Sequence, residues 1–337
     1  MKKKLSINDI AKSLNISVTT VSFILNGRAE EKRIREELVQ KVLKYVEEVG
    51  YKPNSLARSL RTGKSYTIGL MVEDISNPFF ASIARLIEEK AYKNGYKILY
   101  SSTDNDTEKT RDLIQLFRDR HVDGYIIAPP EGIEEDVNTL VNANSPVVLF
   151  DRNLLGTNTD YVGIDNYAST FNAIKHLIGK GYKNIGFITL HSLQSQMQER
   201  LQGYENALNE HGLKSYLKEI PYSKNSESII KHITAFLERK KDLDAVLFGT
   251  NYLAVSGLKA IYSLGLKIPS DLAVIAFDDH DLFELSYPSI TAITQPITEI
   301  SEEVINILLS RLKTPFKNKK AQSVVLETSL LLRNSSG

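Results

Sequence analysis

The chain has 337 residues, no cysteine, and 42 Lys and Arg against 41 Asp and Glu. This length allows more than one domain, and the lack of thiols excludes disulfides and thiol catalysis and is consistent with a cytoplasmic protein. The charges are unevenly distributed, because residues 1–64 hold 14 Lys and Arg against 7 Asp and Glu, a net of +7, and the remainder carries a net of −6. The N-terminal part therefore suits a polyanion such as DNA, and the rest does not.

Residues 6–26, SINDIAKSLNISVTTVSFILN, predict two short amphipathic helices joined by a tight turn. Ser6, with Asp9 three positions later, is expected to cap the first helix, and Ser17 the second. The apolar positions expected to pack inward are Ile7, Ile10, Ala11, Leu14, Val18, Val21, Ile24 and Leu25. The outward positions are then Thr19, Thr20 and Ser22, whose hydroxyls can bond phosphates or base edges in a major groove. An ordinary helical hairpin is the alternative interpretation.

A third amphipathic helix, at about residues 35–49, would complete a small all-α domain. After Gly50 and Pro53 comes NSLARSLRTGKS, a short basic segment that Asn54 or Ser55 could cap as a helix. Seven or eight residues do not hold a helix alone in water, so this one would form on a partner. A basic helix with a protruding Leu60 suits a minor groove that is being wedged open, and a solvated linker is the alternative.

From Tyr66 the chain alternates between short apolar runs and helical patterns, which predicts two doubly wound α/β units with parallel sheets. The runs YTIGLMV, KILYS, GYIIA and PVVLF alternate with helices at about 78–94, 106–120 and 134–142. In the second unit NIGFIT, AVLF and LAVIA alternate with helices at about 166–180, 196–211, 226–240 and 252–264. ITAITQP, a last helix at about 297–312 and the strand QSVVLET follow.

Five blocks in a fixed order resemble the lactose-repressor/galactose-repressor family of bacterial transcription regulators over about residues 6–333. The blocks are SINDIAKSLNISVTTVSFILNG, GYKPNSLARSL, TIGLMVEDISNPFF, RLQGYENAL and the pair AFDD and ITQP. The resemblance implies a DNA-binding regulator that acts as a repressor, as is typical of that family. The implied domains are a helix-turn-helix domain at 1–50, a hinge helix and linker at 51–65, and an effector-binding and dimerisation domain at 66–337.

The resemblance also implies which residues contact DNA. The positions of Val18, Thr19 and Phe23 would lie near base edges, with Arg28 close by, and Leu60 would be inserted between base pairs. The full candidate set is Ser6, Ser17, Val18, Thr19, Thr20, Ser22, Phe23, Asn26, Arg28, Asn54, Leu56, Ala57, Arg58 and Leu60. Phe23 replaces a polar or basic residue that is frequent in the family, and EEKR at 30–33 looks like an insertion, so the operator sequence is not readable from the chain.

The two α/β units resemble the periplasmic-binding-protein fold, in which the chain of family members crosses between lobes three times. We expect the crossings near Gly163, at 288–292 and at 319–322. The first lobe would then comprise about 66–163 and 292–320, and the second about 164–290 and 321–333.

Ligands of open α/β sheets bind beyond the carboxyl ends of the strands, so a cleft between the lobes is the expected effector site. The candidate residues are Asn77, Phe79, Phe80, Asp151, Arg152, Arg200, Thr250, Asn251 and Asp278. Family members usually contact effector at the positions of Arg200 and Asp278. Asn251 replaces a more usual Asp, and Asp151 is followed by Arg where an aromatic could stack on a base. A sugar, sugar derivative or other small polar metabolite is therefore favoured over a purine.

Signs of an enzyme are few. The histidines show no metal-ligand spacing, and neither a G-x-S-x-G elbow nor a phosphate-binding G-x-x-x-x-G-K-[ST] loop occurs, so no catalytic residue, cofactor or metal is expected. Polar residues interrupt the start MKKKLSIND, and no 18-residue apolar run follows, which predicts a cytoplasmic protein without membrane contact. A solute-binding receptor would need an export signal. A regulator controlled by a protein corepressor would need a docking patch near the helix at 78–94.

The expected mechanism uses a homodimer that presents two N-terminal domains to a pseudo-palindromic operator. A small-molecule effector would close the cleft and shift the lobes, which either orders or disorders the hinges. The chain ends at LLLRNSSG without leucine heptads, so a dimer is favoured over a tetramer held by a coiled coil.

Overall fold

The computed structural model describes residues 5–51, 63–313 and 320–337. The chain divides into two compact units, Met1–Ser65 and Tyr66–Gly337, which we call the head unit and the lobed unit. Within the described ranges, no helix is both long and apolar enough to cross a membrane.

The head unit contains three helices, α1 (Ile7–Leu14), α2 (Val18–Leu25) and α3 (Glu36–Glu48). Ile10, Val21 and Val42 are fully buried and hold the three helices together. Small apolar residues from each helix thus form one shared core, as the periodicity predicted.

The predicted caps of α1 and α2 are confirmed. The Ser6 hydroxyl accepts from the Asp9 amide, and the Asp9 carboxylate accepts from the Ser6 amide at 2.8 Å, which is a complete capping box. The Ser17 hydroxyl accepts from the Thr20 amide at 3.0 Å. The prediction that Val18 packs inward is wrong, because it starts the first turn of α2, outside the core, and is 40% exposed.

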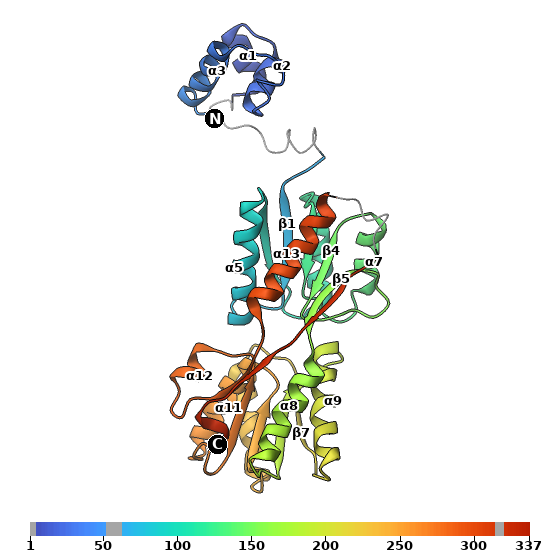
Figure 1. The fold of residues 1–337 in the computed structure, drawn as a ribbon, viewed down its shortest axis with the longest axis vertical. Coiled ribbons are helices and arrows are strands. Elements are labelled where there is room, and N and C mark those ends of the chain that lie inside the picture. Colours follow the sequence, from blue (N-terminus) through green and yellow to red (C-terminus); the bar gives the residue numbers. More distant parts are fainter. Residues whose placement is uncertain (1–4, 52–62, 314–319) are drawn as a thin grey trace. The chain divides into compact units, whose positions relative to one another are not determined.

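The lobed unit consists of two lobes, each built on a six-stranded sheet (Figure 1). Lobe 1 has an all-parallel sheet in the order β11 (Ser323–Leu326), β5 (Asp160–Ile164), β4 (Val147–Phe150), β3 (Gly124–Ile127), β1 (Thr67–Val72), β2 (Lys97–Ser102). Its helices are α5 (Pro78–Lys93), α6 (Thr107–Asp119), α7 (Glu134–Asn142) and α13 (Ile297–Lys313).

Lobe 2 repeats this plan with one antiparallel edge, because β12 pairs antiparallel with β10. The sheet order is β12 (Ser329–Leu331), β10 (Thr291–Thr294), β9 (Ala273–Phe277), β8 (Ala245–Phe248), β6 (Ile185–Leu190), β7 (Tyr216–Ile220). The helices are α8 (Asn166–Gly179), α9 (Ser195–Glu210), α10 (Ser226–Arg239), α11 (Asn251–Ser263) and α12 (Asp281–Leu285), and a 3-10 turn, η2 (Asn334–Ser336), follows β12.

The chain passes between the lobes after β5, after β10 and after β11 (Figure 1). The first passage, just beyond Ile164, lies where it was expected. The expected passages at 288–292 and 319–322 are wrong, because β10 (residues 291–294) still belongs to the lobe 2 sheet and β11 (residues 323–326) belongs to the lobe 1 sheet. Residue 319 itself lies outside the described residues.

Three strands have no counterpart in the sequence prediction, β5, β7 and β12. β5 contains a buried acid, Asp160, whose carboxylate accepts two hydrogen bonds from Arg311 of α13, at 2.6 and 2.7 Å. This pair lies in the interior of lobe 1 and fixes the end of α13 against β5. A charged residue in a strand breaks the apolar pattern by which strands are recognised in a sequence. The burial of Asp160 is explained only by its partner Arg311 in the folded structure.

Candidate functional site

The head unit carries the residues predicted to contact DNA. Those that the structure places on the surface are Ser6, Ser17, Val18, Thr19, Asn26 and Arg28. Thr20, Ser22 and Phe23 are half-buried, and the Thr20 hydroxyl is hydrogen-bonded to that of Ser17 at 2.8 Å. Asn54, Leu56, Ala57, Arg58 and Leu60 lie outside the described residues.

A charged cluster adjoins the C-terminal end of α2. Arg28 donates two hydrogen bonds to the Glu31 carboxylate, at 2.7 and 2.6 Å. The hydrogen bonds from Arg28 and then Lys32 lower the pKa of Glu31 to about 2. Both cations also lie 5.5–5.7 Å from the centre of the Phe23 ring. Arg28 thus has a partner within its own chain before any phosphate or base arrives.

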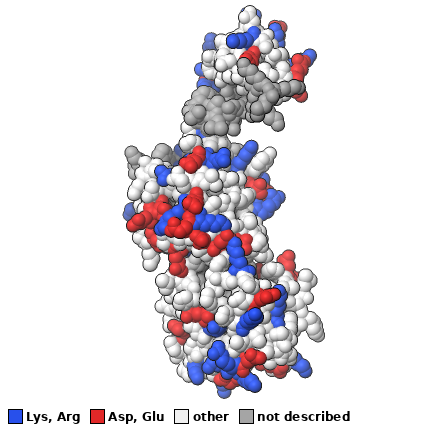
Figure 2. Space-filling model, turned by 180° about the vertical axis from the view of Figure 1, so that it is seen from behind, with Lys and Arg blue, Asp and Glu red and all other residues white. Residues whose placement is uncertain are grey.

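The surface of the lobed unit differs from the basic composition of residues 1–64. Acidic and basic side chains lie intermingled over the face that Figure 2 shows. Surface ion pairs within lobe 1 include Arg111 with Asp136 at 3.1 Å and Lys93 with Glu89 at 2.7 Å. Such mixed surface charge favours solubility over binding to a polyanion.

Polar groups from both lobes converge on a cavity of ≈ 30 Å³ between the carboxyl ends of the two sheets, which we call the cleft cavity. Its lining residues are Glu73, Asn77, Phe79, Phe80, Asp151, Arg152, Leu190, Gln196, Met197, Arg200, Thr250, Tyr252 and Asp278. Parallel strands end at the same edge of a sheet, so residues that follow different strands meet there.

Two aspartates occupy matching places in the two lobes. Asp151 directly follows β4 and Asp278 directly follows β9, and both have φ of 65°. A left-handed backbone is uncommon outside glycine, although Asp tolerates it better than most residues. Burial raises the pKa of both carboxyls, and the Arg200 guanidinium opposes this shift in each. The two left-handed turns therefore place a hydrogen-bond acceptor from each lobe at the cavity.

Arg152 is the centre of a buried network in lobe 1. Its guanidinium donates to Glu73, to Asn105 and, at 3.1 Å, to Asp151. Asn105 in turn donates to Glu73 at 2.8 Å. Burial alone would lower the pKa of Arg152, but the two carboxylates raise it above its ordinary value. Arg152 is therefore fully charged, and its charge is already balanced by the chain itself.

Arg200, in α9 of lobe 2, is only 2% exposed. Its Nε donates to Asn166 at 2.8 Å and its Nη1 to the Gly249 carbonyl at 2.7 Å. The guanidinium carbon lies over the Phe277 ring, 3.5 Å from the ring centre. These contacts hold Arg200 in one position beside Asp278, whose Oδ1 accepts from Gln295 at 2.6 Å.

Several hydrogen bonds connect the lobes around the cleft cavity. Asn77 of lobe 1 and Asn251 of lobe 2 exchange two amide hydrogen bonds, at 3.3 and 3.0 Å. At another point the Glu131 carboxylate accepts from the Leu193 amide at 2.7 Å and from the Ser192 hydroxyl at 3.0 Å. The lobes are therefore held together around a cavity with room for little more than a water molecule.

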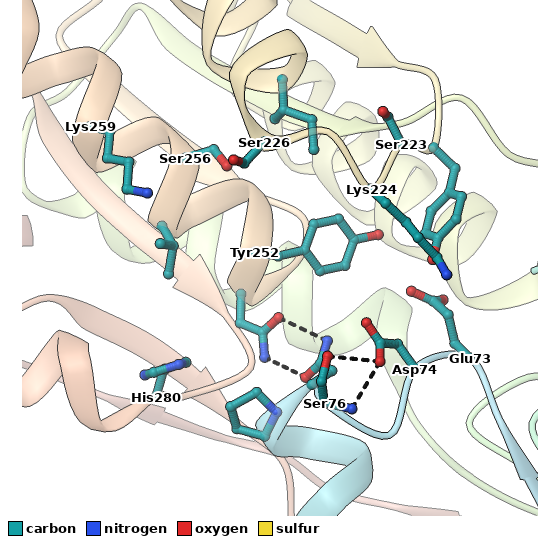
Figure 3. A pocket seen from close by; sticks show the side chains of 16 residues that line it. Glu73, Asp74, Ser76, Ser223, Lys224, Ser226, Tyr252, Ser256, Lys259 and His280 are labelled. Carbon is teal, nitrogen blue, oxygen red and sulfur yellow. Dashed lines mark hydrogen bonds between the residues drawn. The ribbon is translucent and has the colours of Figure 1, made fainter. Parts of the chain in front are cut away.

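A larger cavity of ≈ 380 Å³ opens next to the cleft cavity and shares Glu73, Asn77 and Tyr252 with it. We call it the outer pocket. In Figure 3 the Tyr252 ring projects from α11 into it, toward Glu73 and Lys224, and Lys259 and His280 lie at the opposite end. The larger volume thus lies beside the cleft cavity, and the convergent buried charges line the smaller one.

The structure brings the predicted effector residues together. Asn77, Phe79, Phe80, Asp151, Arg152, Arg200, Thr250 and Asp278 line the cleft cavity, and Asn251 lines the outer pocket. Sequence reasoning missed several residues that line one or both cavities or bond to their lining: Glu73, Asn105, Tyr222, Gln196, Met197, Tyr252 and Gln295. Of these, Glu73 and Gln295 directly follow β1 and β10, where the rule on strand ends would have found them.

Two family models match the chain. Residues 6–54 match the model described as bacterial regulatory proteins, lacI family, and residues 174–336 match the periplasmic binding protein-like domain. The chain is 31% identical over 332 residues to a ribose operon repressor of Haemophilus influenzae, covering 98% of both chains. It is 32% identical over 320 residues to catabolite control protein A of Priestia megaterium, covering 94% of this chain and 93% of that one.

A solved structure gives the same result for the lobed unit. A lacI-family transcriptional regulator from Enterococcus faecium, determined with bound ribose, superposes with a TM-score of 0.71 at 27% sequence identity. The match covers 80% of this chain and 98% of that one. By their names, the relative from Haemophilus influenzae is an operon repressor and the one from Enterococcus faecium is a transcriptional regulator.

Proposed function

This chain belongs to the lacI family of bacterial regulatory proteins, and on that premise we propose that a neutral sugar, bound in the cleft cavity, controls its affinity for an operator. The observation that carries the proposal is the lining of this cavity, where two buried arginines meet three carboxylates and Arg152 is already paired with Glu73 and Asp151. Arg152 and Arg200 meet Glu73, Asp151 and Asp278 at the cavity.

An anionic ligand fits this arrangement poorly. Arg152 is bound by two carboxylates, and Arg200 donates to an amide and a carbonyl. A phosphate or carboxylate entering the cavity would meet three acids and would have to displace these bonds. The hydroxyls of a neutral sugar can instead donate to the carboxylates, while Phe79 and Phe80 offer an apolar surface to the ring. A sugar is also what the regulator from Enterococcus faecium was determined with.

Sugar binding requires the lobes to move. The cleft cavity is far smaller than the cavities of several hundred cubic ångström that bind small molecules. The bonds between Asn77 and Asn251 and between Glu131 and lobe 2 must therefore rearrange before a sugar ring enters. A ligand that binds one lobe arrangement better than the other shifts the population toward it, which is the physical basis for control of DNA binding.

The proposal includes a homodimer that binds a pseudo-palindromic operator through the predicted residues of α2 and the following loop. Support comes from the lacI-family match at 6–54 and the net charge of +7 on residues 1–64. Sedimentation velocity of the full chain at micromolar concentration tests the dimer, and a single monomeric species would contradict it.

A thermal-shift assay tests whether the ligand is a neutral sugar. The full chain is heated with ribose, xylose, arabinose, glucose and galactose, and with the matching sugar phosphates and sugar acids. A neutral sugar at 100 times its Kd should raise the Tm by roughly 5–10 °C, since such binding adds about 2.7 kcal/mol and each kcal/mol moves the Tm of a large domain by about 2–4 °C. Its phosphate should give no comparable shift. A response to the charged sugars alone would contradict the neutral class.

Arg200→Ala should remove the sugar-induced shift and leave operator binding intact, because Arg200 lies in the lobed unit. Arg239→Ala, at an exposed position of lobe 2, is the matched control and should keep the shift. An Arg200→Ala protein that melts cooperatively and still responds to the sugar would exclude the cleft cavity as the site.

A further inference from the structure

Two buried side-chain atoms at the cleft cavity have no hydrogen-bond partner in the described structure, Gln196 Oε1 and the Tyr252 hydroxyl. Gln196 is only 1% exposed. Buried polar atoms are nearly always paired, because leaving one unpaired costs stability. Two such atoms on residues that line the same cavity call for a common explanation.

The orientation of Gln196 is set by a chain of amides. Its Nε2 donates to Gln194 Oε1 at 3.1 Å, and Gln194 donates in turn to Asn105 Oδ1 at 3.3 Å. Asn105 also accepts from Arg152. Because the nitrogen of Gln196 is engaged, its oxygen is the atom left for the cavity, and an oxygen there can only accept.

Tyr252 stands where the cleft cavity and the outer pocket meet, in the first turn of α11 (Figure 3). Burial and, next, the nearby Glu73 carboxylate raise the pKa of Tyr252 well above its ordinary value. The phenol is therefore protonated at all physiological pH values, and it can both donate and accept.

We propose that Gln196 and Tyr252 bind the effector directly, and that the effector donates one hydroxyl to Gln196 Oε1 and hydrogen-bonds the Tyr252 hydroxyl with another group. This inference rests on the proposed function and narrows it to a ligand with a free hydroxyl donor at a defined ring position. A site with a buried acceptor strongly rejects an analogue that lacks the matching donor, since the acceptor would remain unpaired after binding.

The proposal predicts opposite effects on the free protein and on its complex. In Tyr252→Phe an unpaired buried atom disappears, so the Tm of the free protein should stay unchanged or rise. In Gln196→Met the loss of the unpaired oxygen is offset by the loss of the hydrogen bond to Gln194, so the Tm should change little. The Kd for the sugar that gives the largest wild-type shift in the panel of ribose, xylose, arabinose, glucose and galactose should increase roughly tenfold in each variant. Gln202→Met on α9 and Tyr262→Phe on α11, both at exposed positions, should change neither quantity.

Monodeoxy analogues of that sugar identify the hydroxyl by titration calorimetry. One analogue should bind wild type roughly tenfold more weakly than the parent sugar, yet bind Gln196→Met as well as the parent does. A fall in the Tm of the free variants with an unchanged Kd would show that the two groups serve the fold and would overturn the inference, leaving the proposed function intact. If no neutral sugar binds the wild-type chain, the proposed function fails, and this inference fails with it.

Discussion

Asp151 and Asp278 show how single residues build the cleft cavity. Each is the first residue after a buried strand, each has a left-handed backbone, and each places a carboxylate beside Arg200. Asp is one of the few residues other than glycine that accept this conformation with little strain. The carboxylates lose hydration there, which raises their pKa and leaves them in need of hydrogen-bond donors.

The raised pKa values predict how sugar binding depends on pH. A raised pKa means that protonation begins at a higher pH than for an exposed Asp, so the acceptors are lost early on acidification. Sugar affinity should therefore weaken as the pH falls from 7 toward 4, by up to tenfold per pH unit for each proton taken up. Calorimetric titrations across this range measure it. Asp278→Asn should make the dependence shallower, and a wild-type affinity that stays constant down to pH 4 would contradict the assignment.

Glu31 is expected to weaken DNA binding by holding Arg28. Glu31→Gln should free the guanidinium for a phosphate, which tightens binding to a random-sequence duplex several-fold. Each added phosphate contact releases counterions, so the slope of log K against log salt should steepen by about 1. Fluorescence anisotropy at several salt concentrations gives both values. Glu30→Gln makes the same charge change next door, and equal effects of the two variants would show that only net charge matters.

The residues that sequence reasoning found are those whose role depends on local chain geometry. Ser6 and Ser17 cap helices because of their distance from the first apolar turn, and a short pattern reveals that distance. Val18 was placed inside because periodicity does not show where a three-helix core ends. Gln196 and Tyr252 lie in the first turns of α9 and α11, and only the folded structure shows that their polar atoms lack partners.

At the scale of elements, α8 and α9 depend on one glycine. A Cβ at Gly203 would lie 2.4 Å from the Tyr167 carbonyl and 3.1 Å from the Phe171 amide. The backbone of α8 therefore packs directly against α9 at this glycine, where no side chain fits. Arg200 lies one turn earlier on α9. The close approach of the helices therefore also fixes the distance between Arg200 and Asn166 of α8.

Gly203→Ala should push α9 away from α8. The expected cost is about 1–3 kcal/mol, which lowers the Tm by roughly 2–12 °C, and sugar affinity should fall as well because Arg200 shifts. Thermal melting and calorimetry measure the two effects. Gly179→Ala is the control, since a Cβ there has no heavy atom within 4 Å. If the two variants have the same Tm, close packing of α8 against α9 does not require Gly203.

The parallel α/β architecture was predictable because its strands are short apolar runs separated by helices, and most bounds agree within a few residues. The misplaced passages have a physical cause. β11 pairs with β5, far away in the sequence, and β10 pairs both with β9 before it and with β12 beyond α13, so their sheet membership depends on pairing and not on composition. β7 has two partly exposed charged residues at an edge of the sheet, and its pattern does not differ from a loop.

At the scale of the whole molecule, the charge distribution separates two tasks. Residues 1–64 carry a net charge of +7 and the remainder −6, so DNA attracts one end of the chain and not the other. The proposed sugar site lies in the lobed unit, in a cavity that a sugar ring could enter only if the lobes move. The two tasks are coupled only if the lobe arrangement that the sugar prefers differs in its affinity for DNA.

Operator affinity with and without sugar tests this coupling most directly. A duplex selected by the protein from a random-sequence pool is titrated by fluorescence anisotropy, in the absence and in the saturating presence of the neutral sugar that gives the largest thermal shift. We expect the sugar to change the operator Kd by at least about fivefold, which is within the usual range of allosteric coupling, and to leave the operator Kd of Arg200→Ala unchanged. An unchanged operator affinity while the sugar demonstrably occupies the wild-type protein would contradict it.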